Sequence, residues 1–352
     1  MFEQIEPVPP AVTQPVSGLN GLSAETCGAC HSEVYTEWSS SMMADAFDDA
    51  LFQAKWHSVE ENFVCLHCHA PLQEQQPVKA SGLEHIRPMV AAGDDNPLFD
   101  ESLQHEGITC VACHLDEGHV VVSREGTVAP HPVVVQPEFG SDGGVCEGCH
   151  QLAEPVFYRL DRPLIDTVGE WERWQEITGR SETCVDCHMP VVQRKGGEAS
   201  AASEGHSHVF PGARNLEMLQ RGVAVLSVEK SSDGIDVVLE NRAGHHFPTA
   251  EHAHSLVLSV AILDEQGGVI SDSEHEMARH IENRREISDT TLRSGETRSF
   301  HSVFIQQQLA RAVRARVGVH YRRMGLEPAI VEAAGLSESQ RTVVVHLADF
   351  EI

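Results

Sequence analysis

The sequence predicts an α+β protein of two domains: a helix-and-loop domain at the N-terminus followed by an antiparallel β-sandwich. The first observation behind this is a short pattern that occurs five times between residues 27 and 188 and uses all ten cysteines of the 352-residue chain. The second is a series of β-rich segments, joined by turn residues, that begins at about residue 221. Since about two domains are expected at this length, we divide the chain into a linker (1–20), a first domain (21–220) and a sandwich (221–352).

The repeated pattern is Cys-x-x-Cys-His, and we number its copies first to fifth: CGACH, CLHCH, CVACH, CEGCH and CVDCH. It is the attachment signal for covalent c-type haem, in which two cysteines form thioethers and the histidine binds the iron. The pattern therefore predicts five covalently bound haem c groups and a haem-packed cytochrome domain. The predicted thioether residues are Cys27, Cys30, Cys65, Cys68, Cys110, Cys113, Cys146, Cys149, Cys184 and Cys187, and the predicted iron ligands are His31, His69, His114, His150 and His188.

Two other uses of paired cysteines explain the pattern less well. Zinc sites need motifs that converge in pairs, and five motifs do not divide into pairs. A disulfide framework explains an even number of cysteines but not their uniform spacing. Neither explains a histidine directly after every second cysteine.

The composition fits a domain whose core is partly made of cofactor. Aromatic residues are only 5% of the chain, and the N-terminal region has little regular apolar periodicity. Five porphyrins supply apolar surface that the side chains lack.

The formal net charge of −28 restricts the partners. Nucleic acid and anionic lipid both favour basic surfaces, so we expect neither. We expect redox partner proteins, and a basic one suits this charge. The sequence has no stretch that approaches 18 consecutive apolar residues, so we expect no membrane span. Haem is attached to such motifs outside the cytoplasmic membrane, so we expect a periplasmic or extracellular protein. MFEQIEPVPP does not resemble a signal peptide, and we expect that a leader has been removed.

Local patterns predict the elements in order. Ser23 is expected to cap a short helix at the first motif, and residues 31–57 and 163–180 are expected to be helical. Residues 71–103 predict loop with a short helix, residues 191–208 an exposed loop, and residues 117–135 a β-hairpin that turns at Gly126. From residue 221 two hairpins are predicted, with turns at SSDG and GG, followed by three further strands that end in RTVVVHLADFEI.

A haem that only carries electrons usually has protein ligands on both sides of its iron. Seventeen histidines remain after the five in the motifs (22 − 5 = 17). His105 precedes Cys110 by five residues, and His131 lies between two prolines that hold it extended. Either member of two further pairs is a candidate: His206 or His208, and His245 or His246.

The sequence resembles the multihaem c-type cytochromes grouped with the tetrahaem electron carriers of nitrifying bacteria, especially larger members with a C-terminal β-sandwich. The resemblance spans roughly residues 25 to 262 and rests on CGACHSEVYTEW, HEGITCVACH, APHPVVV, EWERW, CVDCHMP, HSHVFPG and AGHHFPT. It implies His131, His208 and His245 as distal iron ligands.

One position departs from this family. Its members often have a haem-binding histidine after the first motif, in W-x-x-S-M-H-A, where this chain has Met43. A thioether is also a haem ligand, so either Met43 (or Met42) binds iron, or the side chain only packs and leaves that haem open or bound by another ligand.

Electron transfer through closely spaced haems is the function that these patterns favour. An enzyme with one open haem, acting on nitrogen oxyanions or hydroxylamine, is the alternative. It is less favoured, because the chain has no Cys-x-x-Cys-Lys motif, no additional cysteine and only three tyrosines. A third possibility is a subunit that associates with copies of itself in a haem-stacked extracellular filament.

Overall fold

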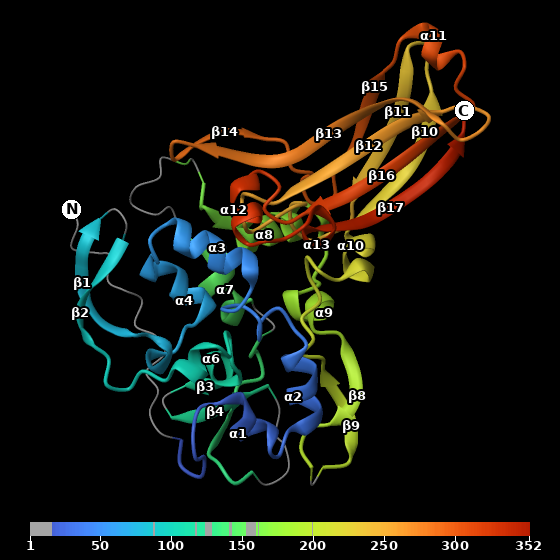
Figure 1. Cartoon of the computed structure of the whole chain (residues 1–352). Helices are drawn as coiled ribbons and strands as arrows, with labels where there is room; N and C mark the ends of the chain where they lie inside the picture. Colours follow the sequence, from blue (N-terminus) through green and yellow to red (C-terminus); the bar gives the residue numbers. More distant parts are fainter. Residues whose placement is uncertain are drawn as a thin grey trace. The chain divides into compact units, whose positions relative to one another are not determined.

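The computed structural model describes residues 16–86, 89–116, 118–123, 129–140, 143–152, 160, 162–198 and 200–352. These residues form two compact units. Unit 1 is the described part of Met1–Cys149 together with Thr183–Pro211, and unit 2 is that of His150–Glu182 together with Gly212–Ile352. The predicted mixture of helices and antiparallel sheets is confirmed (Figure 1).

The helices of unit 1 are short. Ser23 caps α1, as expected, and Asp49 caps α3 by accepting hydrogen bonds from the backbone N–H groups of Leu51 and Phe52. The helix expected over residues 31–57 is instead two helices, α2 and α3, separated by turns. The helices are α1 (Ala24–Gly28), α2 (Ser32–Ser39), α3 (Ala50–Ser58), α4 (Leu66–His69), α5 (Glu101–Gln104), α6 (Cys110–His114), α7 (Gly144–His150) and α9 (Cys184–His188), with 3-10 turns η1 (Phe63–Cys65) and η2 (Gln73–Gln75).

Unit 1 also contains small sheets that correct three sequence-based expectations. Residues 71–103 include the antiparallel pair β1 (Val78–Ile86) and β2 (Met89–Asp95), and the expected loop at 191–208 is the hairpin β8 (Val191–Lys195) and β9 (Ala202–His206). β4 (His119–Val122) pairs with β3 (Leu115–Asp116) and, in parallel, with β5 (Val133–Val135), so β4 and β5 are not the hairpin that was predicted. The expected turn at Gly126 lies outside the described residues.

The apolar clusters of unit 1 are small. One contains Phe47, Trp56, Leu66 and Ala70, and another contains Leu72, Leu103 and Val111. Trp38 is buried separately and donates from Nε1 to the carbonyl of Ile108 (2.8 Å). Side chains alone thus give the described part of unit 1 little continuous core.

Two antiparallel sheets dominate unit 2, and all the strands predicted after residue 221 are present. One sheet has the order β10-β11-β15 and the other β14-β13-β12-β16-β17. Their strands are β10 (Val223–Lys230), β11 (Gly234–Asn241), β12 (Ser255–Leu263), β13 (Val269–Glu282), β14 (Arg285–Asp289), β15 (Thr297–Val303), β16 (Arg314–Arg322) and β17 (Thr342–Glu351). The unit also has β6 (Gln151–Leu152), β7 (Ile165–Asp166), α8 (Thr167–Thr178), α10 (Leu216–Gly222), α11 (Gln306–Leu309), α12 (Pro328–Ala333) and α13 (Glu338–Arg341).

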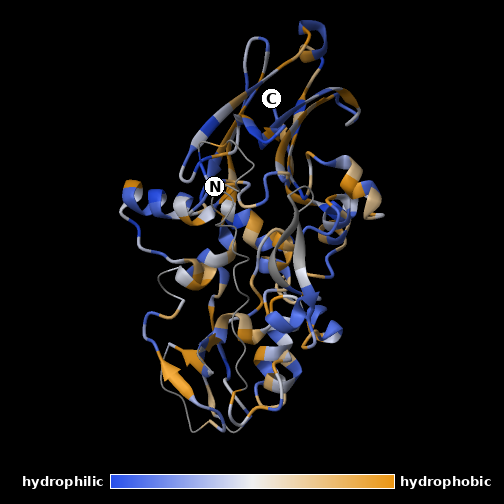
Figure 2. Cartoon of the chain, turned by 90° about the vertical axis from the view of Figure 1, so that its left-hand side faces the viewer, coloured by the Kyte–Doolittle hydropathy of each residue, from blue (hydrophilic) through white to orange (hydrophobic). Residues whose placement is uncertain are grey.

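The two large sheets share one apolar cluster. Side chains such as Val237 and Leu239 from the first sheet and Leu258 and Val317 from the second are at most 1% exposed and belong to the same cluster. Apolar residues (orange in Figure 2) run along these strands. An Ig-like sandwich stays a prediction for this arrangement.

The boundary of the units differs from the one expected. Residues 150–182, which include α8, pack with the large sheets, although the sequence placed them in the first domain. A separate folding domain that begins at residue 221 stays a prediction. Among the described residues, no helix is long and apolar enough to cross a membrane.

Candidate haem sites

Each Cys-x-x-Cys-His motif forms a helical turn. The second to fifth motifs lie on α4, α6, α7 and α9 or at their first turns, and in the first motif the N–H of His31 bonds to the carbonyl of Cys27 (2.9 Å). On a helix, residues i, i+3 and i+4 share one face. Both cysteines and the histidine of each motif are therefore presented on the same side. Local capping supports this in the last motif, where Thr183 and Asp186 form a reciprocal capping box on α9.

The motif histidines share a second feature, the fixing of their rings by the main chain. The Nδ1 atoms of His69, His114 and His188 lie 2.6, 2.8 and 2.8 Å from the carbonyl oxygens of Ala46, Val121 and Pro211. His31 makes the same kind of bond to Gly196. A carbonyl can only accept, so Nδ1 carries the proton and the neutral ring presents Nε2 as its lone-pair nitrogen. This is the arrangement that metal-binding histidines require.

Thiols of different motifs lie within hydrogen-bond reach of one another. The pairs are Cys27 with Cys110, Cys68 with Cys149 and Cys146 with Cys184. In the last pair the hydrogen bond lowers the pKa of Cys184 to about 7. No disulfide bond joins any of the ten cysteines. The first motif thus adjoins the third, and the fourth adjoins both the second and the fifth.

His208 lies opposite the third motif histidine. The ring centres of His114 and His208 are 6.1 Å apart. With metal–nitrogen bonds of about 2 Å, two imidazoles on opposite sides of one iron have centres roughly 6 Å apart. His208 donates from Nδ1 to the carbonyl of His206 (2.9 Å), and burial, followed by the proximity of His114, lowers the pKa of His208 to about 4. This separation would allow His114 and His208 to hold one iron between them, and the lowered pKa keeps His208 neutral, as a ligand must be.

His245 has the same features in unit 2. It is partly buried, and this burial, with a smaller effect of the nearby His150, lowers its pKa. Its Nδ1 bonds to the carbonyl of His246 (2.9 Å). By contrast, His246 directs Nδ1 to the Glu170 carboxylate (3.3 Å). Either arrangement leaves Nε2 available, and of this pair His245 is the ring that lies near His150.

The remaining candidates lie in unit 1. His206 bonds through Nδ1 to the carbonyl of Met189 (2.8 Å), and His131 is partly buried with Nδ1 3.5 Å from the carbonyl of Pro132. His105 pairs with the Asp48 carboxylate (2.6 Å) and is about half exposed. A carboxylate can orient a metal-binding histidine as a carbonyl does.

Met43 lies beside the approach to the third motif. Its carbonyl accepts a hydrogen bond from the backbone N–H of Ile108 (2.9 Å), and its side chain is partly buried. Gly107 lies so close that a β-carbon there would be 2.7 Å from the same carbonyl. The backbone of Met43 is thus bonded to Ile108, which precedes Cys110 by two residues.

The groups that orient these rings could not be predicted from the sequence. The acceptors are carbonyls of unrelated residue types, such as Ala46, Val121 and Pro211. Only the fold brings them to the histidines. Glu170 was also missed, although it lies in EWERW, because a buried role cannot be distinguished from a surface role in a charged helix.

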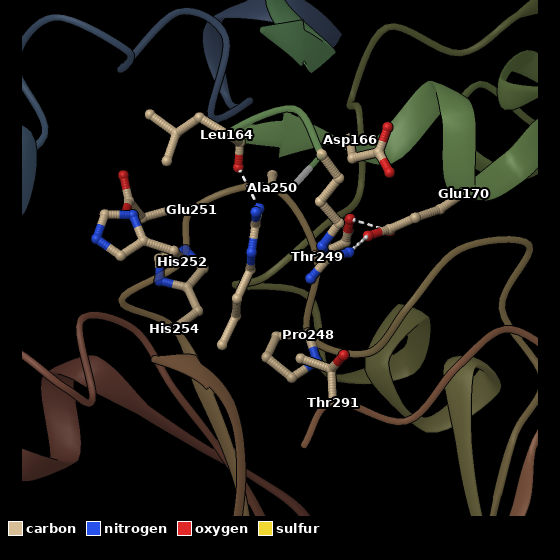
Figure 3. Close-up of a pocket in the computed structure, with 12 residues that line it drawn as sticks. Leu164, Asp166, Glu170, Pro248, Thr249, Ala250, Glu251, His252, His254 and Thr291 are labelled. Carbon is tan, nitrogen blue, oxygen red and sulfur yellow. Dashed lines mark hydrogen bonds and ion pairs between the residues drawn. The ribbon is translucent and has the colours of Figure 1, made fainter. Parts of the chain in front are cut away.

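An open hollow of about 300 Å³ lies in unit 2 next to the His245 loop. Burial raises the pKa of Glu170, and the neighbouring His246 partly opposes this rise. Figure 3 shows Glu170 reaching from α8 to the Thr249 hydroxyl, which donates a bond of 2.6 Å. Polar side chains surround the hollow, including Arg162, Asp166, Glu170, Thr249, Arg279 and Thr291.

The fold is that of a multihaem c-type cytochrome. The penta-heme cytochrome c552 from Thermochromatium tepidum superposes with a TM-score of 0.69, over 94% of this chain and 98% of that one, at 19% sequence identity. No protein-family model matches the sequence. A β-glucuronidase from glycoside hydrolase family 2 aligns with 38% of this chain and 11% of its own, at 14% identity and a TM-score of 0.18. The predicted multihaem cytochrome fold is confirmed, whereas kinship with the tetrahaem carriers of nitrifying bacteria stays a prediction.

Proposed function

We propose that this protein is a pentahaem c-type cytochrome that transfers electrons between redox partner proteins outside the cytoplasmic membrane. The observation that carries the proposal is that four motif histidines, each next to its cysteine pair, present Nε2 because a main-chain carbonyl holds Nδ1. Haem iron bound at these motifs supplies one-electron chemistry between its ferric and ferrous states. The likeness to a pentahaem cytochrome supports the count of five.

The roles of the residues follow from this proposal. The ten cysteines form the thioethers, and His31, His69, His114, His150 and His188 are the proximal ligands. His208 is the distal partner of His114, on the evidence of their 6.1 Å separation, and His245 is that of His150. His131, His105 and Met43 are candidates for the other irons. Iron with two protein ligands leaves no position for substrate, and this favours a carrier over an enzyme.

The thiol contacts suggest how the motifs connect. The first motif meets the third through Cys27 and Cys110, and the fourth meets the second and fifth through Cys149 and Cys146. Burial raises the pKa of Cys113 to about 11, and the nearby Cys149 adds a smaller effect. Cys113 belongs to the third motif and Cys149 to the fourth, so these two motifs are also close to each other. The fourth motif is then a junction with three neighbours, and the route for electrons is branched.

Mass measurement of the denatured protein tests the proposal. We expect five haem masses on the wild type and four on a Cys184→Ala, Cys187→Ala double variant, since thioether bonds survive denaturation. Stepwise reduction should then titrate five one-electron centres. A wild type that retains fewer than five haems would contradict the proposal.

A further inference from the structure

The loop that carries His245 is fastened to unit 2 by a few polar groups. Asn241, 1% exposed, donates from Nδ2 to the carbonyls of His245 (2.9 Å), Leu292 (2.9 Å) and Arg293 (3.0 Å). Backbone bonds in both directions join Phe247 to Leu292 (2.8 and 3.0 Å). These contacts fix one side of the loop.

A single carboxylate fixes the other side. Glu170, 5% exposed on α8, accepts hydrogen bonds at Oε2 from the backbone N–H of His246 (3.0 Å) and from the hydroxyl of Thr249 (2.6 Å). Its Oε1 faces His246 Nδ1 (3.3 Å) and Arg162 Nη1 (3.5 Å). One side chain therefore holds two residues of the loop, directly after His245 and four residues beyond it.

The surroundings keep this carboxylate in place. Arg162 is itself held by Asp289 (2.6 Å) and Glu286 (3.4 Å) of β14. The helix that carries Glu170 lies tightly against the loop, since a β-carbon on Gly244 would be 3.3 Å from the Trp174 ring. A buried carboxylate that accepts bonds from the loop and faces a guanidinium is satisfied only when the loop has this one conformation.

We propose that Glu170 is a positioning residue that holds His245 in the geometry needed to bind iron, an inference that rests on the proposed function. Glu170 acts through the main chain of His246 and the side chain of Thr249. Without it, two buried donors lose their acceptor, and the loop gains by moving toward water. His245 then leaves the axial position for part of the time.

The test compares five variants of the full haem-loaded protein. His245→Ala defines the spectrum of the opened haem: a ferric high-spin signal from one haem in five, with binding of added cyanide. Glu170→Ala is expected to give the same signal in part and to bind cyanide about 10-fold faster than the wild type, because unpaired donors favour the displaced loop. Glu170→Gln keeps a carbonyl that can accept the same two bonds but loses the ion pair with Arg162, so its spectrum and cyanide rate should lie closer to the wild type than those of Glu170→Ala.

Two further variants control for general damage. Glu172→Ala changes an exposed carboxylate on the same helix and should match the wild type. Thr249→Val keeps the side-chain shape and removes one of the two loop bonds to Glu170, together with the contact between the Thr249 and Thr167 hydroxyls (2.9 Å). It should give an intermediate cyanide rate even if Glu170→Ala does not fold.

Different results would contradict the assignment of His245 as a ligand and the positioning role of Glu170. If His245→Ala leaves all haems low-spin, the ligand assignment is wrong. If His245→Ala opens a haem but neither Glu170→Ala nor Thr249→Val changes the spin state or cyanide rate, the ligand assignment stands and the positioning role is overturned.

Discussion

The two units differ in what their interiors are made of. In unit 2, twenty buried apolar residues of the two large sheets and their connections form one cluster. In the described part of unit 1, the clusters around Phe47 and around Leu72 have four and three such residues. The two units therefore differ in how much of their interior is formed by apolar side chains. Unit 2 has a side-chain core of its own, whereas unit 1 is arranged around the five motifs.

The hydrogen-bond partners of the histidine rings also differ between the two units. In unit 1 the motif rings bond to main-chain carbonyls and present Nε2. In unit 2 several rings bond to side chains instead: His301 to Asp236 (2.8 Å), His275 to Ser302 (2.8 Å) and His320 to Ser259 (3.0 Å). His245 follows the pattern of unit 1, since its Nδ1 bonds to the main-chain carbonyl of His246.

Withholding haem should expose the difference most strongly. In a host that cannot attach haem, unit 1 should fail to fold, because its small clusters cannot offset the conformational entropy of its residues. Residues from about 212 onward should remain folded. Limited proteolysis followed by mass spectrometry should recover a C-terminal fragment and degrade the rest. A haem-free chain in which both units resist protease equally would show that unit 1 has a sufficient core.

Truncating one buried leucine in each unit sharpens the comparison. Leu258→Ala in unit 2 should lower the free energy of unfolding by about 2–5 kcal/mol, because a continuous core cannot collapse onto the cavity. Leu72 in unit 1 is equally buried. Leu72→Ala should lower the free energy of unfolding by less, about 2 kcal/mol, because its small cluster can relax around the cavity. Denaturation followed by haem absorbance and by circular dichroism measures both. An equal or greater cost for Leu72→Ala is the contrary result.

Removing one distal ligand tests the histidine pattern within unit 1. His208→Ala should convert one haem in five to the high-spin state, because the partner of His114 is lost. His206→Ala is the matched control, two residues away, and should leave all haems low-spin. Electron paramagnetic resonance of the ferric protein distinguishes these outcomes. If the control variant opens the haem instead, the ligand assignment must be exchanged between the two.

The smallest effect concerns Met43. If its thioether binds iron, the ferric protein should show a weak near-infrared sulfur-to-iron band, and one haem should titrate above the others, since methionine favours ferrous iron. Axial ligands as a class move haem potentials over roughly 0.8 V. Met43→His should abolish the band and lower that one potential. A wild type that lacks the band and binds cyanide at one haem would assign Met43 to packing and favour the enzyme alternative.

Sequence reasoning succeeded where a local pattern determines the structure. The short helix at the first motif, the helix at 167–178 and the strands after residue 221 all have such patterns. It failed for β1 with β2 and β8 with β9, whose polar strands have no apolar alternation to reveal them, and for the parallel pairing of β4 with β5. These pairings depend on partners distant in the sequence.

The candidate sites divide in the same way. Cysteine spacing predicted which residues attach haem, and neighbouring motifs suggested the distal histidines. The nearness of His245 to His150, and the 6.1 Å between the rings of His208 and His114, residues 94 positions apart (208 − 114 = 94), became known only from the fold. Such contacts result from the fold and have no spacing of their own.

The use of main-chain carbonyls to orient histidines has an evolutionary consequence. Every residue has a carbonyl, so replacing the side chain of Ala46 or Val121 leaves the acceptor in place. The orientation of these ligands is therefore tolerant of ordinary sequence drift and sensitive mainly to insertions, deletions and changes that bend the backbone. Homologues can then diverge widely in sequence around the haems while keeping the same ligand geometry.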